Sequence, residues 1–202
     1  MLWPDSQEHP YTLIAIYQWR DEETLDLETT VEAKVELPDF EIFLSSYLGA
    51  RFPVTSVYVK HPEGGDSNGF MTAETRYGTW QVYPRDEKAL SLVKDGRWTI
   101  PPNPVDWAIM PELAAPLVYR REPETGLVVA LMAPAEDCFA ALTPERDEPH
   151  RSMYLSLFGR TLQAGETARA RVRLVVSDVL DDAGIVARYE EYVKEIEQIG
   201  QR

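Results

Sequence analysis

The sequence is short of cysteine and contains no long apolar run. Cys138 is the single cysteine in 202 residues, so no disulfide can form within the chain. Residues 1–11 lack the basic stretch followed by an apolar stretch with which a secretory signal begins. No apolar run approaches the roughly 20 residues that a helix needs to cross a bilayer. We therefore expect a cytoplasmic protein without a membrane partner.

Basic residues are also scarce relative to acidic ones. The chain has 20 lysines and arginines against 34 aspartates and glutamates, which gives a formal charge of −14 at pH 7. Nucleic acids and anionic membranes are bound by basic surfaces, so this composition argues against both partners. The acidic residues are distributed along the whole chain, which indicates a soluble, self-repelling surface.

Signatures of metal or nucleophilic catalysis are absent from the sequence. The three histidines, His9, His61 and His150, do not have the HxH or HExxH spacing of zinc sites. No serine lies in a GxSxG motif. Cys138 follows two acidic residues, which raise the pKa of a thiol, so we predict a buried apolar role for it. We expect no cofactor and no metal.

What the sequence does contain is the alternation of apolar and polar residues that is typical of half-buried β-strands. Residues 25–35 alternate between an apolar and a largely charged face, and residues 11–19 are rich in aromatic and β-branched side chains. The acidic residues 21–24 between them suit a tight turn. The two segments are therefore predicted to form a hairpin.

The stretch from His150 to Val176 shows this alternation most clearly, and the fold prediction is organised around it. In its second half, apolar residues alternate with Arg169, Arg171 and Arg173. Gly159, Gly165 and the polar residues between them supply a turn. The pattern predicts a β-hairpin with one face in the core.

Further strands are predicted from shorter apolar segments. They are expected at residues 54–60, 117–121, 127–132 and 139–142, with two more within 70–82 and a long exposed loop at 61–69. Residues 99–111 contain four prolines and are flanked or interrupted by Trp98 and Trp107. We predict an irregular ordered loop there, with an interdomain linker as the alternative.

Three helices are predicted. Residues 39–48 have apolar side chains at helical spacing after Pro38, which favours a helix over a strand. A short helix is expected at 86–94. An amphipathic C-terminal helix is expected from about 181 to 199, ended by Gly200. Together the elements predict one domain over residues 1–202: mainly β, a two-sheet antiparallel sandwich with a C-terminal α-helix.

The C-terminal part of the sequence resembles the last strands of sugar-active β-supersandwich domains, the galactose-mutarotase-like group. The resemblance is carried by LFGRTLQAGETARARVRLVV, including the leucine-x-x-glycine-glutamate turn at 162–166, and by RYEEYVKE in the helix that follows. Residues 40–174 as a whole are similar to bacterial proteins of this kind. The resemblance implies a carbohydrate-related function. Because a complete supersandwich is longer, it also implies either that several strands are missing here or that another chain completes the sheet, in a homo-oligomer or with a partner.

His150 is the candidate catalytic residue, with Asp137 and Glu148 as its candidate carboxylate partners. Glu148 is close in sequence, and we expect strand pairing to bring Asp137 across from the histidine. A carboxylate beside an imidazole forms a general acid/base pair that can protonate a sugar ring oxygen and deprotonate a hydroxyl. The alternative is that His150 caps a loop through hydrogen bonds.

A second candidate set combines aromatic rings with arginines. Sugars are bound by aromatic faces on their apolar C–H surfaces and by planar polar groups on their hydroxyls. The candidate substrate-binding residues are Trp80, Tyr83, Arg85, Arg97, Trp98 and Trp107. The alternative is that Arg85–Asp86 and Asp95–Arg97 are structural ion pairs and that the tryptophans belong to the core.

Three functions follow from these observations. The first is recognition of a carbohydrate on a concave face of the sandwich. The second is a sugar-active enzyme, an epimerase or mutarotase, a lyase or a glycosidase, with His150 as general acid or base. The third is a structural module that pairs with a partner chain. The sequence leaves open whether any reaction is catalysed.

Overall fold

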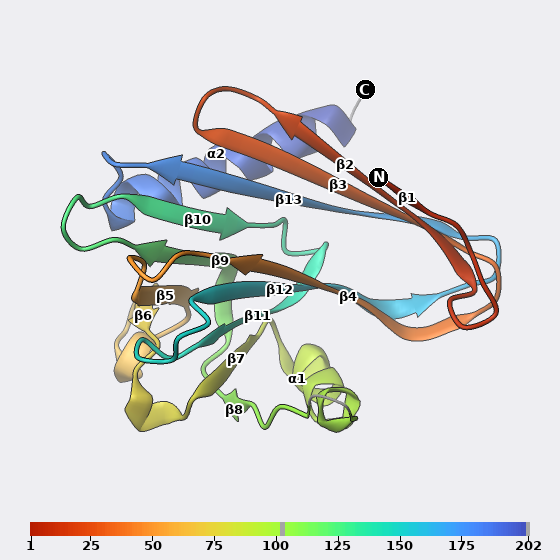
Figure 1. Cartoon of the computed structure of the whole chain (residues 1–202), viewed down its shortest axis with the longest axis horizontal. Coiled ribbons are helices and arrows are strands. Elements are labelled where there is room, and N and C mark those ends of the chain that lie inside the picture. Colours follow the sequence, from red (N-terminus) through yellow and green to blue (C-terminus); the bar gives the residue numbers. More distant parts are fainter. Residues whose placement is uncertain (102–103, 201–202) are drawn as a thin grey trace.

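The computed structural model describes residues 1–101 and 104–200, which form two β-sheets packed face to face (Figure 1). In this part of the chain the larger sheet has eight strands, in the order β1 (Leu2–Trp3), β2 (Tyr11–Trp19), β3 (Thr24–Ala33), β13 (Thr167–Ser177), β10 (Val128–Met132), β9 (Leu113–Arg121), β5 (Val54–Val59) and β6 (Gly69–Thr72). The smaller has five, in the order β4 (Leu37–Tyr47), β12 (Ser152–Leu162), β11 (Cys138–Pro144), β7 (Trp80–Pro84) and β8 (Ala108–Ile109).

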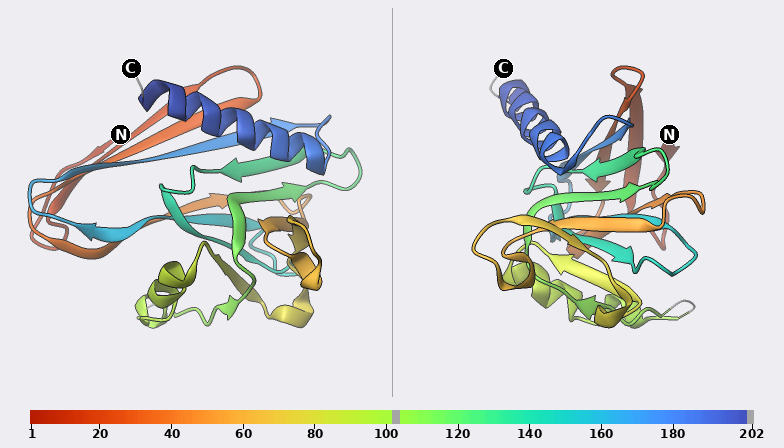
Figure 2. Two further views of the ribbon diagram at one scale, coloured as in Figure 1. Left: turned by 180° about the vertical axis from the view of Figure 1, so that it is seen from behind. Right: turned by 90° about the vertical axis from the view of Figure 1, so that its left-hand side faces the viewer.

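Helices lie on the outer faces of both sheets. Helix α2 (Asp182–Gly200) covers the larger sheet, and α1 (Glu87–Val93) covers part of the smaller one (Figure 2). Single 3₁₀ turns occur at Pro62–Gly64, Thr75–Tyr77 and Arg97–Thr99. All strand pairs are antiparallel among the described residues except β7 with β8. The predicted fold class, a mainly β two-sheet sandwich with a C-terminal helix, is confirmed.

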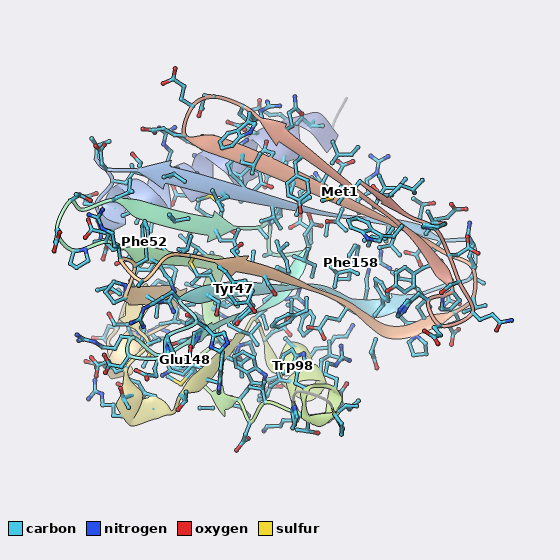
Figure 3. The ribbon with its side chains drawn as sticks, in the orientation of Figure 1. Met1, Tyr47, Phe52, Trp98, Glu148 and Phe158 are labelled. Atoms are coloured by element: carbon cyan, nitrogen blue, oxygen red, sulfur yellow. The ribbon has the colours of Figure 1, made fainter. Side chains whose placement is uncertain are left out.

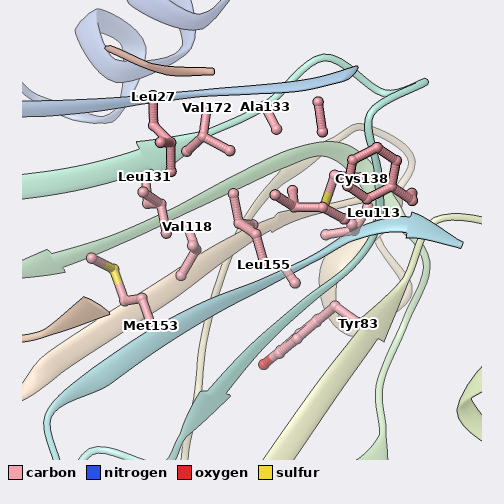
Figure 4. Close-up of a cluster of buried hydrophobic side chains, with 14 of the residues drawn as sticks. Leu27, Tyr83, Leu113, Val118, Leu131, Ala133, Cys138, Met153, Leu155 and Val172 are labelled. Carbon is pink, nitrogen blue, oxygen red and sulfur yellow. The ribbon is translucent and has the colours of Figure 1, made fainter. Parts of the chain in front are cut away.

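The core fills the space between the sheets. The larger sheet contributes Leu27, Val118 and Leu131, and the smaller one contributes residues such as Met153 and Leu155 (Figure 4). Burial of apolar side chains from both inner faces is what holds two such sheets together. The same layer includes the buried thiol discussed next.

Cys138 is fully buried in this core, as predicted. Burial raises the pKa of its thiol to about 12. The charges of the acidic neighbours raise this pKa less than burial does. The predicted buried role is confirmed, and burial is the main cause of the raised pKa.

The hairpin predicted for residues 11–35 is confirmed. β2 and β3 pair from Tyr11 opposite Ala33 to Trp19 opposite Leu25. The predicted strands at 54–60, 70–82, 117–121, 127–132 and 139–142 are also present, and β9 pairs with β10 as a hairpin.

The hairpin predicted for residues 150–176 is wrong. β12 pairs with β4 and β11 in the smaller sheet, whereas β13 pairs with β3 and β10 in the larger one. The connection after Leu162 therefore carries the chain from one sheet to the other. Both strands present apolar residues to the same core, and alternation alone does not distinguish strands that pair side by side from strands that stack across a core.

The two glycines predicted for this turn have different positions. Gly165 lies in the connection with φ +82°, as expected for a turn. Gly159 instead lies within β12, where the pairing with β4 shifts register and Phe158 and Gly159 both have positive φ. A Cβ at Gly159 would come within 2.5 Å of the Phe139 ring, so this bulge requires glycine.

The helix predicted for residues 39–48 is also wrong, because this segment is the strand β4. Ile42 and Leu44 point to the core, while Glu41, Phe43 and Tyr47 are on the opposite face. The apolar positions fit both periods, and pairing with β12 decides in favour of the strand. Pro38 is tolerated because β4 is an edge strand of its sheet.

The other two predicted helices are confirmed. Asp86 caps α1 by accepting a hydrogen bond from the Ala89 amide at 2.8 Å. Asp181 accepts one from the Gly184 amide at 2.8 Å at the start of α2. No helix in residues 1–101 and 104–200 has the length and apolar character needed to cross a membrane.

The proline-rich segment is irregular, as predicted, and adds strand β8 to the smaller sheet. The Met110 amide donates to the Val82 carbonyl oxygen at 2.9 Å, which continues the contact of β8 with β7. Pro102 and Asn103 belong to this predicted loop and lie outside the described residues.

Candidate functional site

A groove of about 820 Å³ lies on the outer face of the smaller sheet, the face that points away from the larger sheet. The sheet supplies its floor from β4, β12 and β7, and the segment around Trp98 and Trp107 supplies the opposite wall. Tyr47, Trp98 and Glu148 are all seen on this side of the molecule, below the ribbon of β4 (Figure 3).

Aromatic rings dominate the lining. Seven of them form a closed circuit in which each ring contacts the next, with centroids between 4.8 and 6.3 Å apart. In order around the circuit they are Phe43, Tyr154, Tyr47, His150, Trp80, Trp107 and Trp98. Most of these contacts are tilted or edge-to-face, the arrangements that aromatic pairs prefer. Trp107 also contacts Tyr154 across the circuit, with centroids 6.1 Å apart, so the rings form one packed cluster.

Local backbone geometry positions the tryptophan wall. Gly96 has φ +90°, which reverses the chain after α1 and starts the 3₁₀ turn that carries Trp98. Trp107 precedes β8, and its ring lies 5.7 Å from that of Trp80 at the start of β7. Pairing of β8 with β7 thus sets the distance between these two rings.

Arg97 supplies a charged group at the bottom of the groove. Its guanidinium is held by Asp95, with Nη2 at 2.7 Å from Oδ2, and by Glu41, with Nη1 at 3.2 Å from Oε2. The Glu41 side chain is only 11% exposed. Burial raises the pKa of Glu41 above its ordinary value, and its polar neighbours Ser156 and Arg97 oppose this shift.

His150 lies at the opposite rim of the groove beside Glu148. Its Nδ1 is 2.6 Å from Glu148 Oε1, and its backbone amide donates to Oε2 of the same carboxylate at 2.7 Å. When Nδ1 carries the proton, this contact leaves Nε2 as an acceptor that a ligand can use. His150 and Glu148 therefore come together as the sequence suggested.

Asp137 does not join them. It lies just before β11, whose Cys138 pairs opposite Leu157, whereas His150 precedes the other end of β12. Asp137 accepts a hydrogen bond from the Arg171 amide at 2.9 Å, and burial raises its pKa to about 6. Strand pairing places it along the length of β12 away from the histidine, so the expected pairing of Asp137 with His150 is wrong.

Tyr83 and Arg85 are likewise outside the groove. Tyr83 is fully buried between the sheets and donates to Gln81 Oε1 at 2.9 Å. Arg85 donates to the Ala135 carbonyl oxygen at 2.8 Å and pairs with Asp86 at 2.7 Å, which ties the turn before β11 to the start of α1. Both side chains therefore make structural contacts and do not line the groove.

The sequence analysis missed the part of the groove that comes from β4 and β12. These residues are Glu41, Phe43, Ser45, Tyr47 and Tyr154. The period-two spacing of the four residues in 41–47 was visible in the sequence, but the assignment of a helix concealed that they share one face. Within the described residues no three His, Cys, Asp or Glu side chains gather as metal ligands would.

Comparisons with known proteins found partial similarity to solved structures at low sequence identity. Neither a scan against protein-family models nor a search of curated proteins found a match. Among solved structures, an α-galactosidase from Lactobacillus brevis matches with a TM-score of 0.44 and 9% identity over 83% of this chain and 21% of that one. A candidate aldose 1-epimerase from Klebsiella pneumoniae matches with a TM-score of 0.38 and 8% identity over 91% of this chain and 54% of that one.

A candidate kojibiose phosphorylase from the human microbiome matches with a TM-score of 0.35 and 10% identity, over 93% of this chain and 19% of that one. The chain thus spans about a fifth to about half of the length of these proteins. At such identities the similarity concerns the course of the chain alone.

Proposed function

We propose that this protein binds a carbohydrate in the groove on the outer face of its smaller sheet. The observation that carries the proposal is a cluster of seven aromatic rings that lines an 820 Å³ groove, together with the Arg97–Glu41 ion pair and the His150–Glu148 contact. Aromatic faces match the apolar C–H surfaces of pyranose rings, and fixed polar groups match their hydroxyls. The sequence resemblance to galactose-mutarotase-like domains supports the same class of ligand.

The groove offers both kinds of contact. Trp98 and Trp107 are half-buried, so their rings are held by neighbours yet retain an accessible side. Tyr47 is 62% exposed at the mouth of the groove. Nε2 of His150 and the one N–H of Arg97 without a partner among the described residues would be the donors and acceptors for hydroxyls of a ligand.

A binding test compares two tryptophans of this chain. Trp98→Ala should lower the affinity for a glycan at least about tenfold, since loss of a stacked aromatic anchor is costly in truncation experiments. Trp19→Ala is the matched control, because Trp19 is exposed on β2 of the other sheet and should leave affinity unchanged. Binding is found on a glycan array and measured by calorimetry. If no glycan binds the wild type, or if Trp98→Ala binds as well as Trp19→Ala, the proposal is wrong.

The second candidate is a sugar-active enzyme, an epimerase or mutarotase, a lyase or a glycosidase. The 2.6 Å contact between His150 Nδ1 and Glu148 favours it, because a carboxylate that fixes the imidazole tautomer prepares Nε2 for proton transfer. His150→Ala should then reduce turnover by roughly 10²–10⁴-fold while glycan binding persists. Anomer exchange by NMR and absorbance of unsaturated products measure turnover. If the protein binds glycans but converts none of them, the enzymatic function is wrong and the binding function remains.

A further inference from the structure

The charged groups of the groove are largely committed to one another. Arg97 Nε and Nη2 donate to Asp95 at 3.0 and 2.7 Å, and Nη1 donates to Glu41 Oε2 at 3.2 Å and to the Asp39 carbonyl oxygen at 3.0 Å. A guanidinium has five N–H donors, so these contacts leave one N–H without a partner among the described residues. The histidine at the far rim is in turn held by the Glu148 carboxylate.

This arrangement disfavours an acidic ligand. Proteins recognise carboxylates and sulfates through a cation with free donors, most often an arginine that binds two oxygens at once. Among the described residues the groove lining contains one guanidinium, Arg97, and one carboxylate, Glu41, and Asp95 pairs with Arg97 from outside the lining. Arg97 with its two carboxylate partners is net negative when both are ionised. A ligand carboxylate in the groove would meet the Glu41 carboxylate and a guanidinium whose paired donors are already taken.

Glu41 is placed at a cost that its ion pair does not fully offset. The side chain is 11% exposed, and Oε1 is buried without a hydrogen-bond partner in the described part of the chain. A buried carboxylate is destabilising unless its surroundings compensate it. The polar neighbours of Glu41 are Arg97 and Ser156, so its carboxylate is part of the charged cluster around Arg97.

We propose, on the basis of the carbohydrate site above, that the groove selects uncharged saccharides over acidic ones and that Glu41 enforces this choice by occupying Arg97. An uncharged sugar needs only ring faces and single hydrogen bonds, which the groove supplies. A uronic acid or a sulfated sugar needs the donors that Glu41 and Asp95 already take. Specificity of this kind arises by repulsion of the wrong ligand as much as by attraction of the right one.

The experiment uses matched pairs of ligands. Cellotetraose, maltotetraose and galactotetraose are each compared with the same oligosaccharide after oxidation of its primary hydroxyls to carboxylates. The wild type should bind the oxidised form at least about tenfold more weakly than the neutral form for every backbone it recognises. Calorimetry at two salt concentrations measures the ratio, which should decrease at the higher one because salt screens the repulsion.

Two variants test the role of Glu41. Glu41→Gln keeps a hydrogen-bond acceptor for Arg97 but removes the charge, so the preference for the neutral form should fall below about threefold. Asp95→Asn, in which the altered side chain is 37% exposed, should act in the same direction and guards against misfolding of the first variant. Glu28→Gln on the other sheet is the control and should leave the ratio unchanged.

Each outcome has one meaning. Equal or tighter binding of the oxidised sugars by the wild type overturns the charge selection while leaving carbohydrate binding intact. A ratio that neither Glu41→Gln nor Asp95→Asn changes overturns the role of Glu41. If none of these sugars and no glycan on the array binds, the carbohydrate function itself fails, and the selection proposal fails with it.

Discussion

The outer faces of the two sheets are covered in different ways. On the larger sheet, α2 buries Ile185 and Tyr192 completely against Leu117, Tyr119 and Met132. On the smaller sheet, a seven-residue helix and an irregular segment cover only part of the face and leave a groove lined with half-exposed aromatic rings. Helix α2 packs closely on β9, β10 and β13, although open space remains between its C-terminal half and β2, lined by Ile16 and Ile199. The buried side chains under α2 therefore stabilise the fold, whereas the partly exposed rings on the smaller sheet offer an apolar surface to a ligand.

The largest effect on stability is expected at Ile185, which is fully buried between α2 and the larger sheet. Ile185→Asp places a carboxylate in an apolar contact that has no exposure, and should lower the free energy of unfolding by roughly 4 kcal/mol. Ile199→Asp on the same helix is the matched control, since Ile199 is 64% exposed and should change stability by less than about 0.5 kcal/mol. Urea denaturation measures both. Equal effects would show that α2 does not seal the sheet through Ile185.

An intermediate effect is expected from Asp137, a buried carboxylate that accepts a hydrogen bond from the Arg171 amide of β13. Burial raises the pKa of Asp137 from 3.8 to about 6, so the folded protein holds this proton to a higher pH than the unfolded chain does. The contribution to stability is therefore fully present below pH about 4 and is lost as the pH rises to about 6.

Asp137→Asn should flatten the stability profile between pH 4 and pH 6. The change in slope should be at most about 1.4 kcal/mol per pH unit, the value for one proton. Asp66→Asn, in an exposed loop, is the control and should follow the wild type. Denaturation at several pH values measures the profiles, and a wild-type slope that Asp137→Asn retains would assign it to other groups.

The smallest effect on stability is expected in the groove. Tyr47 is 62% exposed and touches the rings of His150 and Tyr154 from the side. Tyr47→Ala should therefore change the free energy of unfolding by less than about 1 kcal/mol while weakening glycan binding several-fold. Denaturation and calorimetry on one preparation give both numbers. A loss of stability comparable to that of Ile185→Asp would mean that Tyr47 is packed in the folded protein and is not available to a ligand.

Most strands could be predicted from the sequence because alternation is a local signal. The β2–β3 hairpin and α2 followed directly from period two and from helical spacing. Residues 39–48 could not be assigned in this way, since their apolar positions satisfy both periods. The partner of each strand is a non-local property, and for this reason residues 150–176 were correctly predicted as two strands and wrongly predicted as a hairpin.

The residues of the candidate site likewise fall into those with a local signal in the sequence and those that depend on strand pairing. The structure brings together His150, Glu148, Trp80, Arg97, Trp98 and Trp107, which stand out in the sequence as aromatic or charged residues near loops. Glu41 and Tyr154 were missed because they reach the groove only through the pairing of β4 with β12. Asp137 was misplaced because its position depends on the register of β11 against β12. The residue types suggested a site, and the strand register determines its members.

The crossing from β12 to β13 has a consequence for how the chain folds. β12 lies between β4 and β11, and β13 lies between β3 and β10, so both strands occupy interior positions of their sheets. Until residues 152–177 have left the ribosome, each sheet consists of two parts with no strand to join them. Native closure thus waits for late, long-range pairing, which is slow and leaves unpaired edges exposed in the meantime. A nascent chain of this protein is expected to depend on chaperones until its last two strands insert.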